Sequence, residues 1–372
     1  MEVKKVICKY TGETFSKQNS VDIISAADIS QVSFCLNYVK KRKPVVLRSE
    51  NPVNISDQVL INLIGEKTVE VEDNSVASFG ETDAGSRRRI VFKEFLRQLP
   101  NGNLYLSTQK IKDDKKTGVP LDFMPEILRV LHDNGIIPLH IPIAGDLILD
   151  QVNCWMGYSN EGSSSGFHHD YHDNLYFVLR GKKTFNILSP DFMDCDHSPV
   201  RTHGNFRTST VIQSNGLICY GKDFREDGSP DPKSQNFNEK NSSNPDSFCV
   251  NRHAPDNALP VELFPGDIFY LPAGFFHEVI SSNDGKRNGH FAVNYWYPPP
   301  ISESHDGNLY LGNYWRRRYQ IIAERAGYIP NSKRITISRN RYLRWRRKPR
   351  PFFMFYSRDH MKKKIRTRRF QL

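Results

Sequence analysis

The residues His168-His169-Asp170 place an imidazole and a carboxylate two positions apart in the chain. Side chains alternate between the two faces of a β-strand, so His168 and Asp170 share one face and His169 points to the other. Two histidines and one carboxylate on one side of a metal form the facial triad of non-heme Fe(II) sites, which leaves coordination positions open. The pair therefore predicts two of three metal ligands. The alternative is a polar loop whose histidines are solvated.

A second histidine, His277, follows a pattern of turn, strand and turn. Residues 265–267 (Pro-Gly-Asp) and 272–274 (Pro-Ala-Gly) have turn chemistry, and the apolar run 268–271 between them is typical of a short strand. In a small barrel the ends of strands distant in sequence meet at one mouth, so His277 can complete the site. The alternative is a histidine satisfied within an aromatic core, since two phenylalanines precede it.

Several further motifs, spread between roughly residues 43 and 300, carry a family resemblance. They are KRKPVVLRSE (41–50), NLYLSTQ (103–109), NCWMGYSNEGSSSGFHHDYHDN (153–174), PGDIFYLPAGFFH (265–277) and FAVNYWY (291–297). With them the chain resembles the JmjC (cupin-like) Fe(II)/2-oxoglutarate dioxygenases. Within that family it is similar to the small hydroxylases related to the asparaginyl hydroxylase that inhibits hypoxia-inducible factor.

The resemblance implies a mainly β fold, with a double-stranded β-helix (jelly-roll or cupin) core, flanking helices and a basic, helical C-terminal extension. It also implies Fe(II) as the metal, 2-oxoglutarate as the co-substrate and O2 as the oxidant. The metal ligands would be His168, Asp170 and His277, and the residues at the family's co-substrate positions are Lys183, Tyr105, Ser165, Asn174 and Asn294. The family usually has threonine where this chain has serine at 165, and both side chains carry a hydroxyl. A lysine inside a barrel needs an anion to pair with it, which agrees with the role implied for Lys183.

The chain divides into four expected parts. Residues 1–110 are a lead-in that packs on the barrel, and residues 111–300 are the catalytic core, with a long polar insert at about 191–260. Residues 301–332 include an amphipathic helix that suggests a homodimer interface, and residues 333–372 form a basic, aromatic tail. An insert of this length usually serves as a lid or a substrate-binding loop, or is locally disordered.

Periodicity predicts three helices in the first half of the chain. The segments are 25–39, 91–99 and 125–132, and a strand is expected at 44–47. In the second helix Phe92, Phe95 and Leu99 fall on one face, where we expect them to pack rather than to function. A lone histidine near an apolar run, His140, is interpreted as structural.

The cysteines and the N-terminus favour an intracellular protein. Six cysteines are scattered without a CxxC motif, as expected for reduced thiols. The first residues lack the apolar run of a secretory signal, and no stretch is apolar enough to span a bilayer. We therefore expect a cytoplasmic or nuclear protein, or one found in both. Cys195, His197, Cys249 and His253 could in principle bind zinc, although their spacing matches no standard signature.

The tail, residues 333–372, carries sixteen lysines and arginines and one aspartate, hence a net charge of +15. The whole chain carries +11, so the preceding residues sum to −4. Basic residues interleaved with aromatic ones are typical of nucleic-acid binding. A nuclear import signal in KKKIRTRR (362–369), a surface for an acidic protein or anionic lipid, and simple solubility are the alternatives.

The sequence thus predicts an Fe(II)- and 2-oxoglutarate-dependent oxygenase that hydroxylates a side chain of a protein substrate. One alternative is an oxygenase that acts on RNA or on a nucleic-acid-associated protein, with histone demethylation as a variant. Another is a cupin-like binding module without enzymatic activity. The intact H-x-D pair, His277 and Lys183 argue against the last, because degenerate family members typically lose a ligand.

Overall fold

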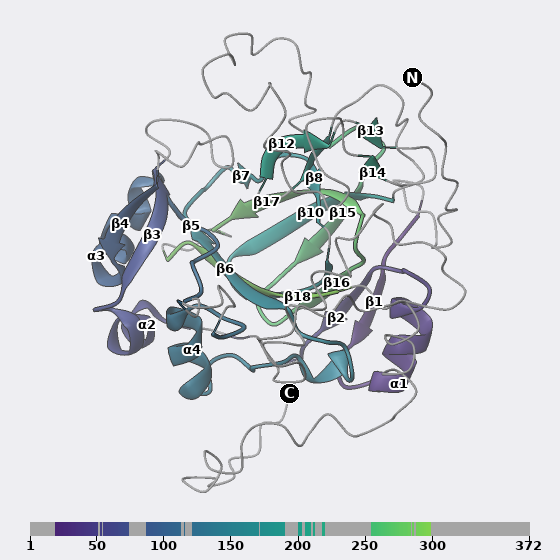
Figure 1. Ribbon diagram of the computed structural model, residues 1–372, viewed down its shortest axis with the longest axis horizontal. Helices are drawn as coiled ribbons and strands as arrows, with labels where there is room; N and C mark the ends of the chain where they lie inside the picture. Colours follow the sequence, from purple (N-terminus) through teal and green to yellow (C-terminus); the bar gives the residue numbers. More distant parts are fainter. Residues whose placement is uncertain are drawn as a thin grey trace, which may run out of the picture.

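Two β-sheets packed face to face form the core of the fold (Figure 1). The structure is a computed structural model that describes residues 19–298, except for stretches that include 74–86, 116–120, 190–199 and 220–253. A further two-stranded sheet joins β13 (Val211–Ile212) to β14 (Ile218–Cys219). The mainly β, jelly-roll core expected from the sequence is confirmed.

The larger sheet contains nine strands drawn from distant parts of the chain. Its order is β1 (Asp22–Ser25), β2 (Val45–Arg48), β16 (Ile268–Leu271), β9 (Asp173–Arg180), β18 (His290–Tyr297), β6 (Gln151–Gly157), β5 (Leu104–Leu106), β3 (Thr68–Asp73) and β4 (Arg87–Val91). The β1–β2 pair is parallel, and the other neighbours in this sheet are antiparallel. Strands of the lead-in segment thus continue the sheet that β9, β18 and β6 form at its centre.

The smaller sheet contains seven strands and faces the larger one. Its order is β12 (Asn205–Ser209), β11 (Val200–Thr202), β8 (His168–His169), β17 (Phe276–Ser282), β10 (Lys182–Leu188) and β15 (Leu259–Leu263), and β7 (Ser163–Ser164) pairs with β17. Strand β17 therefore lies between β8 and β10. This arrangement brings segments that are distant in sequence to one place inside the barrel.

Alternation along β9 explains why the larger sheet is buried on both faces. Leu175, Phe177 and Leu179 belong to a core shared with the helices, whereas Tyr176 and Val178 belong to the core of the barrel interior. All residues of β9 are buried, as expected for a strand covered on both sides. A polar side chain that is buried in the barrel interior therefore needs a hydrogen-bond partner.

Helices pack on the outer face of the larger sheet (Figure 1). They are α1 (Gln31–Phe34), continued by the π-helix η1 (Cys35–Val39), α2 (Asp57–Ile64), α3 (Phe92–Gln98), continued by η3 (Leu99–Asn101), α4 (Glu126–Asp133) and η4 (Pro142–Ala144). The helices predicted at 91–99 and 125–132 agree with α3 and α4. Phe92, Phe95 and Leu99 are buried in the outer core, as predicted.

The first predicted helix begins later than its periodicity indicated. Residues up to Ser25 belong to β1, and α1 begins at Gln31. The physical reason is local: the hydroxyl of Ser30 accepts a hydrogen bond from the backbone N–H of Ser33 at 3.1 Å and caps the helix there. An apolar pattern gives the period of a helix, whereas the cap decides where it starts.

Several predicted features lie outside the described residues. They are the helix expected at 301–332, the tail at 333–372, most of the insert at 191–260 and the four residues considered for zinc. In the part of the chain that the structure describes, no helix is both long and apolar enough to cross a membrane.

Candidate active site

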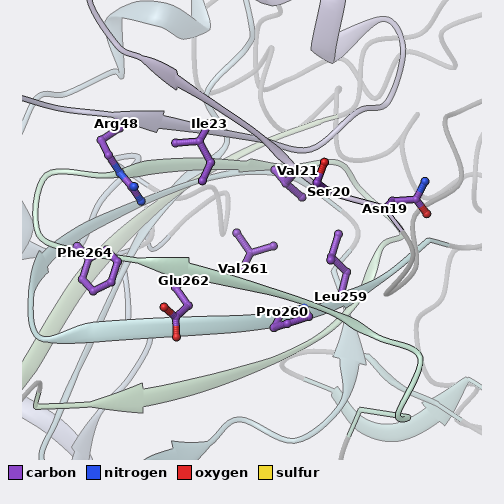
Figure 2. A pocket seen from close by; sticks show the side chains of 10 residues that line it. All are labelled: Asn19, Ser20, Val21, Ile23, Arg48, Leu259, Pro260, Val261, Glu262 and Phe264. Carbon is purple, nitrogen blue, oxygen red and sulfur yellow. The ribbon is translucent and has the colours of Figure 1, made fainter.

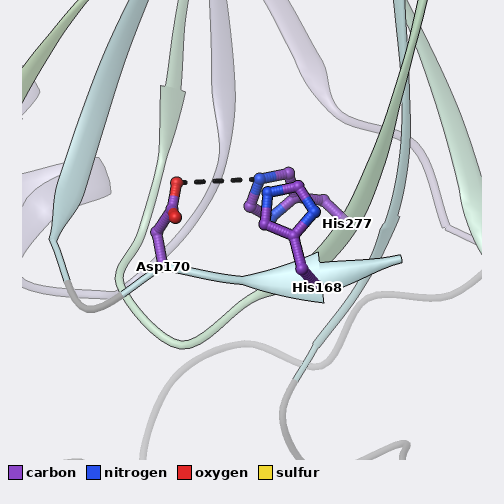
Figure 3. Close-up of side chains that lie close together, drawn as sticks. All are labelled: His168, Asp170 and His277. Atoms are coloured by element: carbon purple, nitrogen blue, oxygen red, sulfur yellow. Dashed lines mark ion pairs between the residues drawn. The ribbon is translucent and has the colours of Figure 1, made fainter. Parts of the chain in front are cut away.

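The three predicted metal ligands converge inside the barrel. His168 on β8 and His277 on β17 are directly opposite in the antiparallel register, and the centroids of their rings are 4.3 Å apart. Asp170 follows β8, and its Oδ2 lies 3.8 Å from Nε2 of His277 (Figure 3). Each residue offers one ligand atom, and these atoms all lie within 4.8 Å of one another. The fold thus brings two imidazoles and a carboxylate to one point.

Backbone carbonyls fix the orientation of both imidazoles. Nδ1 of His168 lies 2.8 Å from the carbonyl oxygen of Gly166, and Nδ1 of His277 lies 3.1 Å from that of Phe275. A carbonyl oxygen can only accept, so these contacts assign the proton to each Nδ1 and leave each Nε2 with the lone pair that a metal requires. Hydrogen bonds of this kind, from the nitrogen that does not bind the metal, orient the histidine ligands of a metal site.

The triad is buried, which changes the chemistry of its carboxylate. His168, Asp170 and His277 are at most 8% exposed. Burial raises the pKa of the Asp170 carboxyl to about 7. A carboxylate is costly in such a place unless a positive charge meets it, and a divalent metal would supply that charge.

A buried ion pair connects the segments on either side of the triad. Asp173 accepts two hydrogen bonds from the guanidinium of Arg42, at 2.6 and 2.8 Å, and one from the backbone N–H of Ala273 at 2.9 Å. Ala273 lies in the turn that precedes His277, and the neighbouring N–H of Gly274 donates to the carbonyl oxygen of Asp170. Asp173 therefore helps to hold the turn that precedes His277 next to the segment that carries Asp170.

Lys183 on β10 is fully buried in the barrel interior. Its Nζ donates to Oγ of Ser281 at 2.6 Å and to Nδ1 of His290 at 3.0 Å. No carboxylate among the described residues pairs with it, and burial lowers the pKa of its ammonium to about 7. Lys182, the preceding residue, is partly exposed and pairs with Glu262. A buried ammonium of this kind is suited to an anionic ligand.

The model of the cupin-like domain family matches residues 31–303 of this chain. This chain belongs to the cupin-like JmjC-domain family. The matched range contains the triad, Lys183 and every motif on which the resemblance was based.

Curated relatives of this JmjC-domain protein have related names but distant sequences. JmjC domain-containing protein 4 of Schizosaccharomyces pombe is 24% identical over 435 residues, which cover 82% of this chain and 91% of the relative. The lysine-specific demethylase JMJ32 of Arabidopsis thaliana is 28% identical, over 40% of this chain and 41% of the relative. The human bifunctional peptidase and (3S)-lysyl hydroxylase JMJD7 is 26% identical, over 42% of this chain and 46% of the relative.

Tyr105 and Ser165, two of the residues predicted to bind the co-substrate, have different surroundings in this JmjC-domain protein. Tyr105 lies on β5 with its ring 6.0 Å from that of His290, near Lys183. Burial raises the pKa of its hydroxyl, so this group stays protonated and can donate. The hydroxyl of Ser165 accepts from the backbone N–H of Val279 at 2.9 Å and donates to the carbonyl oxygen of Gly166 at 3.1 Å. The role of Ser165 as a carboxylate donor stays a prediction.

The two predicted asparagines bind each other inside the barrel. Nδ2 of Asn294 on β18 donates to Oδ1 of Asn174 on β9 at 3.1 Å, and Nε1 of Trp155 donates to Oδ1 of Asn294 at 2.9 Å. Both asparagines are buried. The NH2 group of Asn174 is a hydrogen-bond donor that a bound carboxylate or water could use.

Sequence reasoning missed Ser281 and His290, the two partners of Lys183. A signal existed for both. Ser281 is four residues after His277 and therefore on the same strand face, and His290 is four residues before Asn294. The closing strand was expected to begin at residue 291, whereas β18 begins one residue earlier and includes His290.

A separate hollow of about 360 Å³ lies between β15 and the segment that leads into β1 (Figure 2). It is lined in part by Val21, Arg48, Val261 and Phe264, and it contains no residue of the triad. Strands β1 and β15 are edge strands of the two sheets in the described fold, so the hollow lies between one edge of each sheet. The site is therefore defined by the triad and Lys183 rather than by this surface hollow.

Proposed function

We propose that this protein is an Fe(II)- and 2-oxoglutarate-dependent oxygenase that hydroxylates a side chain of a protein substrate. One observation carries the proposal: the barrel interior holds a buried triad of two histidines and a carboxylate together with a buried lysine that no described carboxylate neutralises. The triad suits a metal cation that keeps open coordination positions, and the buried lysine suits an anion.

The donor set fits an iron ion and a co-substrate with two carboxylates. His168, Asp170 and His277 would hold Fe(II), because this triad is the arrangement that such oxygenases use. When bound, iron and 2-oxoglutarate supply the oxidising chemistry with O2, and the protein supplies binding and orientation. Lys183 is the group that would hold the far carboxylate.

The strand register supports a ligand that extends from the triad to Lys183. Lys183 is paired with Ser281, which is four residues from His277 on β17. Four residues of strand span roughly 13 Å. The Nζ of Lys183 stays at the Ser281 end of this distance, so a metal ion at the triad and a short, extended dicarboxylic acid would lie between the two ends. Burial of both ends keeps water away from them, which strengthens each charge interaction.

The choice of a protein substrate rests on the names of relatives and on the sequence. One relative is named a lysyl hydroxylase and another a lysine-specific demethylase, and both names refer to lysine. Hydroxylation and demethylation both begin at a C–H bond, so the same site chemistry would serve either. RNA, or a protein associated with nucleic acid, remains the alternative substrate because of the basic tail at 333–372.

The test is succinate formation by the Fe(II)-loaded protein with 2-oxoglutarate and O2, measured separately with protein fractions and with RNA fractions. We expect protein fractions to stimulate turnover, and mass spectrometry to find a product heavier by one oxygen atom. Release of formaldehyde would identify demethylation instead. Stimulation by RNA alone would replace the protein substrate with a nucleic acid.

Two variants make this test specific to the triad. Asp170→Ala removes the carboxylate and should abolish turnover. His132→Gln changes a half-buried histidine on α4, whose Nδ1 contacts the carbonyl oxygen of Ile137, and should leave turnover unchanged. If the wild type neither retains iron nor forms succinate, the alternative of a binding module without activity gains support.

Three further expectations from the sequence stay proposals. We propose that the tail binds nucleic acid or an acidic partner, that residues 301–332 mediate a homodimer, and that the protein is cytoplasmic, nuclear or both. A protein without residues 333–372 should keep its turnover and lose salt-sensitive RNA binding if the tail binds RNA. Unchanged RNA binding by that shortened protein would assign the tail another role.

A further inference from the structure

Asp170 differs from the other two members of the triad in what holds its backbone. His168 lies on β8 and His277 on β17, and these strands pair directly with each other, so the smaller sheet fixes both backbones. Asp170 lies after the end of β8 and before Asp173, the first residue of β9, and therefore belongs to neither strand. Its position depends on the contacts that it and its near neighbours make.

One set of contacts comes from the turn before His277. The carbonyl oxygen of Asp170 accepts a hydrogen bond from the backbone N–H of Gly274 at 2.9 Å. Asp173 reaches the same turn through the backbone N–H of Ala273. A second set of contacts is made by His172, and it involves a different part of the fold.

The imidazole of His172 is held at its edge and on its face. Its Nε2 lies 2.8 Å from Oδ2 of Asp150, which is a hydrogen-bond distance. Its ring stacks on that of Trp296 on β18, with the centroids 5.0 Å apart and the planes inclined by 7°. The side chains of His172 and Asp150 are 6% and 0% exposed. Breaking a hydrogen bond between two buried groups is costly, so the ring has little freedom to move.

The two supports of His172 belong to one part of the larger sheet. Asp150 immediately precedes β6, and its backbone N–H donates to the carbonyl oxygen of Trp296 at 2.8 Å. Strands β6 and β18 are paired along their whole length. The residue that binds the edge of the imidazole is therefore joined to the residue that covers its face. A shift of His172 would break the hydrogen bond, the ring stack or both.

We propose that His172 and Asp150 are positioning residues for the metal ligand Asp170. Two residues of chain span at most roughly 7 Å, so a fixed His172 restricts the place that the Asp170 carboxylate can take. Together with the contacts of the turn before His277, this pair would hold the one ligand that no strand pairing fixes. The inference rests on the proposed function, because it concerns the metal site of that function.

A purely structural role for the pair makes a different prediction. Its loss would then lower the free energy of unfolding, and the folded molecules would keep the wild-type affinity for metal. His140 provides a matched control for such a role. Its two ring nitrogens contact the carbonyl oxygens of Ile141 and Leu147 at 2.9 and 3.1 Å, and its ring packs edge-on against Tyr297, the residue after Trp296. His140 is 30 residues from Asp170 in the chain.

The experiment measures Co(II) binding to the metal-free, full-length protein through the visible absorption of the bound ion. This absorption also reports the geometry of the ligands, and the measurement needs neither oxygen nor a co-substrate. For Asp150→Ala and His172→Phe we expect the dissociation constant to rise roughly 10- to 100-fold, the usual effect of losing a residue that supports a metal ligand, with an altered spectrum. Phenylalanine keeps an aromatic ring against Trp296 and removes the hydrogen bond.

Asp150→Asn tests the hydrogen bond without removing the side chain. An amide can accept from Nε2–H of His172 or donate to Nε2, so the bond is retained whichever group carries the proton. The dissociation constant of Co(II) for this variant should stay within about threefold of the wild-type value. His140→Phe should change it less than about twofold, although this variant also loses buried hydrogen bonds.

Urea unfolding of each metal-free variant shows how much of it is folded. If His172→Phe or Asp150→Ala does not fold because one polar partner is left buried alone, the double variant Asp150→Leu, His172→Phe replaces both partners with apolar groups, which a buried site tolerates better. This double variant should also bind Co(II) roughly 10- to 100-fold more weakly than the wild type.

The outcomes distinguish this inference from the proposed function. Wild-type affinity in a folded variant without the hydrogen bond, or equal weakening in His140→Phe, would overturn the inference and leave the proposed function intact. If the wild type binds no Co(II), the metal site itself is absent, and the proposed function fails together with the inference.

Discussion

Replacing Lys183 by methionine should stabilise the ligand-free protein and abolish binding of the co-substrate. Lys183 is fully buried, and burial lowers the pKa of its ammonium from 10.5 to about 7. Methionine has a similar length and no charge, so it can fill the same space. Lys183 would therefore bind the anion in the loaded protein and lower the stability of the ligand-free protein.

The size of the effect follows from the contacts of Lys183. A pKa lowered from 10.5 to about 7 corresponds to a cost of about 4 kcal/mol in the free energy of unfolding at pH 7, since each pKa unit is worth about 1.4 kcal/mol and the buried group is already about half deprotonated at that pH. Methionine also removes the two hydrogen bonds to Ser281 and His290, each worth about 1 kcal/mol. The net gain expected for Lys183→Met at pH 7 is about 2 kcal/mol.

The dependence on pH has a definite sign. The folded-state pKa of Lys183 lies below the unfolded value, so between about pH 7 and pH 10.5 the unfolded chain binds more protons than the folded protein. The cost of burying the ammonium is complete below pH 7 and disappears as the pH approaches 10.5. The advantage of Lys183→Met should therefore shrink as the pH rises through this window.

Urea unfolding of the metal-free proteins measures this difference, and calorimetry with 2-oxoglutarate measures the loss of binding. Lys182→Met is the matched control, because Lys182 is the neighbour on the outer face and pairs with Glu262 in a partly exposed salt bridge. It should change neither quantity appreciably. If Lys183→Met lowered the free energy of unfolding, or kept the affinity for 2-oxoglutarate, the reasoning about an unneutralised buried ammonium would be wrong.

Three further predictions follow from the site. Mutation of a residue that hydrogen-bonds a metal ligand lowers metal affinity roughly 10- to 100-fold, and His277→Ala, which removes a ligand itself, should lower iron affinity by more than that. His132→Gln should keep the wild-type iron content. Equal iron content in the two variants would show that His277 is not a metal ligand. Because the ammonium of Lys183 must be protonated to hold an anion, the dissociation constant of 2-oxoglutarate for the wild type should rise about tenfold per pH unit above pH 7, and calorimetry that found no change from pH 7 to pH 9 would contradict this. Asp173→Asn leaves a buried guanidinium without its carboxylate and should cost about 3–5 kcal/mol in urea unfolding, whereas Glu66→Gln, which breaks an exposed pair, should leave the midpoint nearly unchanged.

Local rules predicted much of the fold from the sequence. Helical periodicity located α3 and α4, and turn chemistry on either side of an apolar run located β16. The start of α1 was misplaced, because its boundary depends on a single hydroxyl at Ser30 rather than on the period. Each of these features is determined by residues within a few positions of one another, and for that reason a pattern can reveal it.

The sequence by itself determined that His168 and Asp170 share a face, that Lys183 and Lys182 point to opposite sides, and that His277 follows a pattern of turn, strand and turn. The tertiary structure alone decided that β8 pairs with β17, which places His277 beside the other two ligands. It alone decided that Lys183 meets Ser281 and His290 instead of an acid, and that Arg42 reaches Asp173. These contacts join strands and turns that are far apart in the chain, and their pairing depends on how two sheets bury their apolar faces together. Alternation specifies the face on which a side chain lies, whereas packing decides which side chains it meets there.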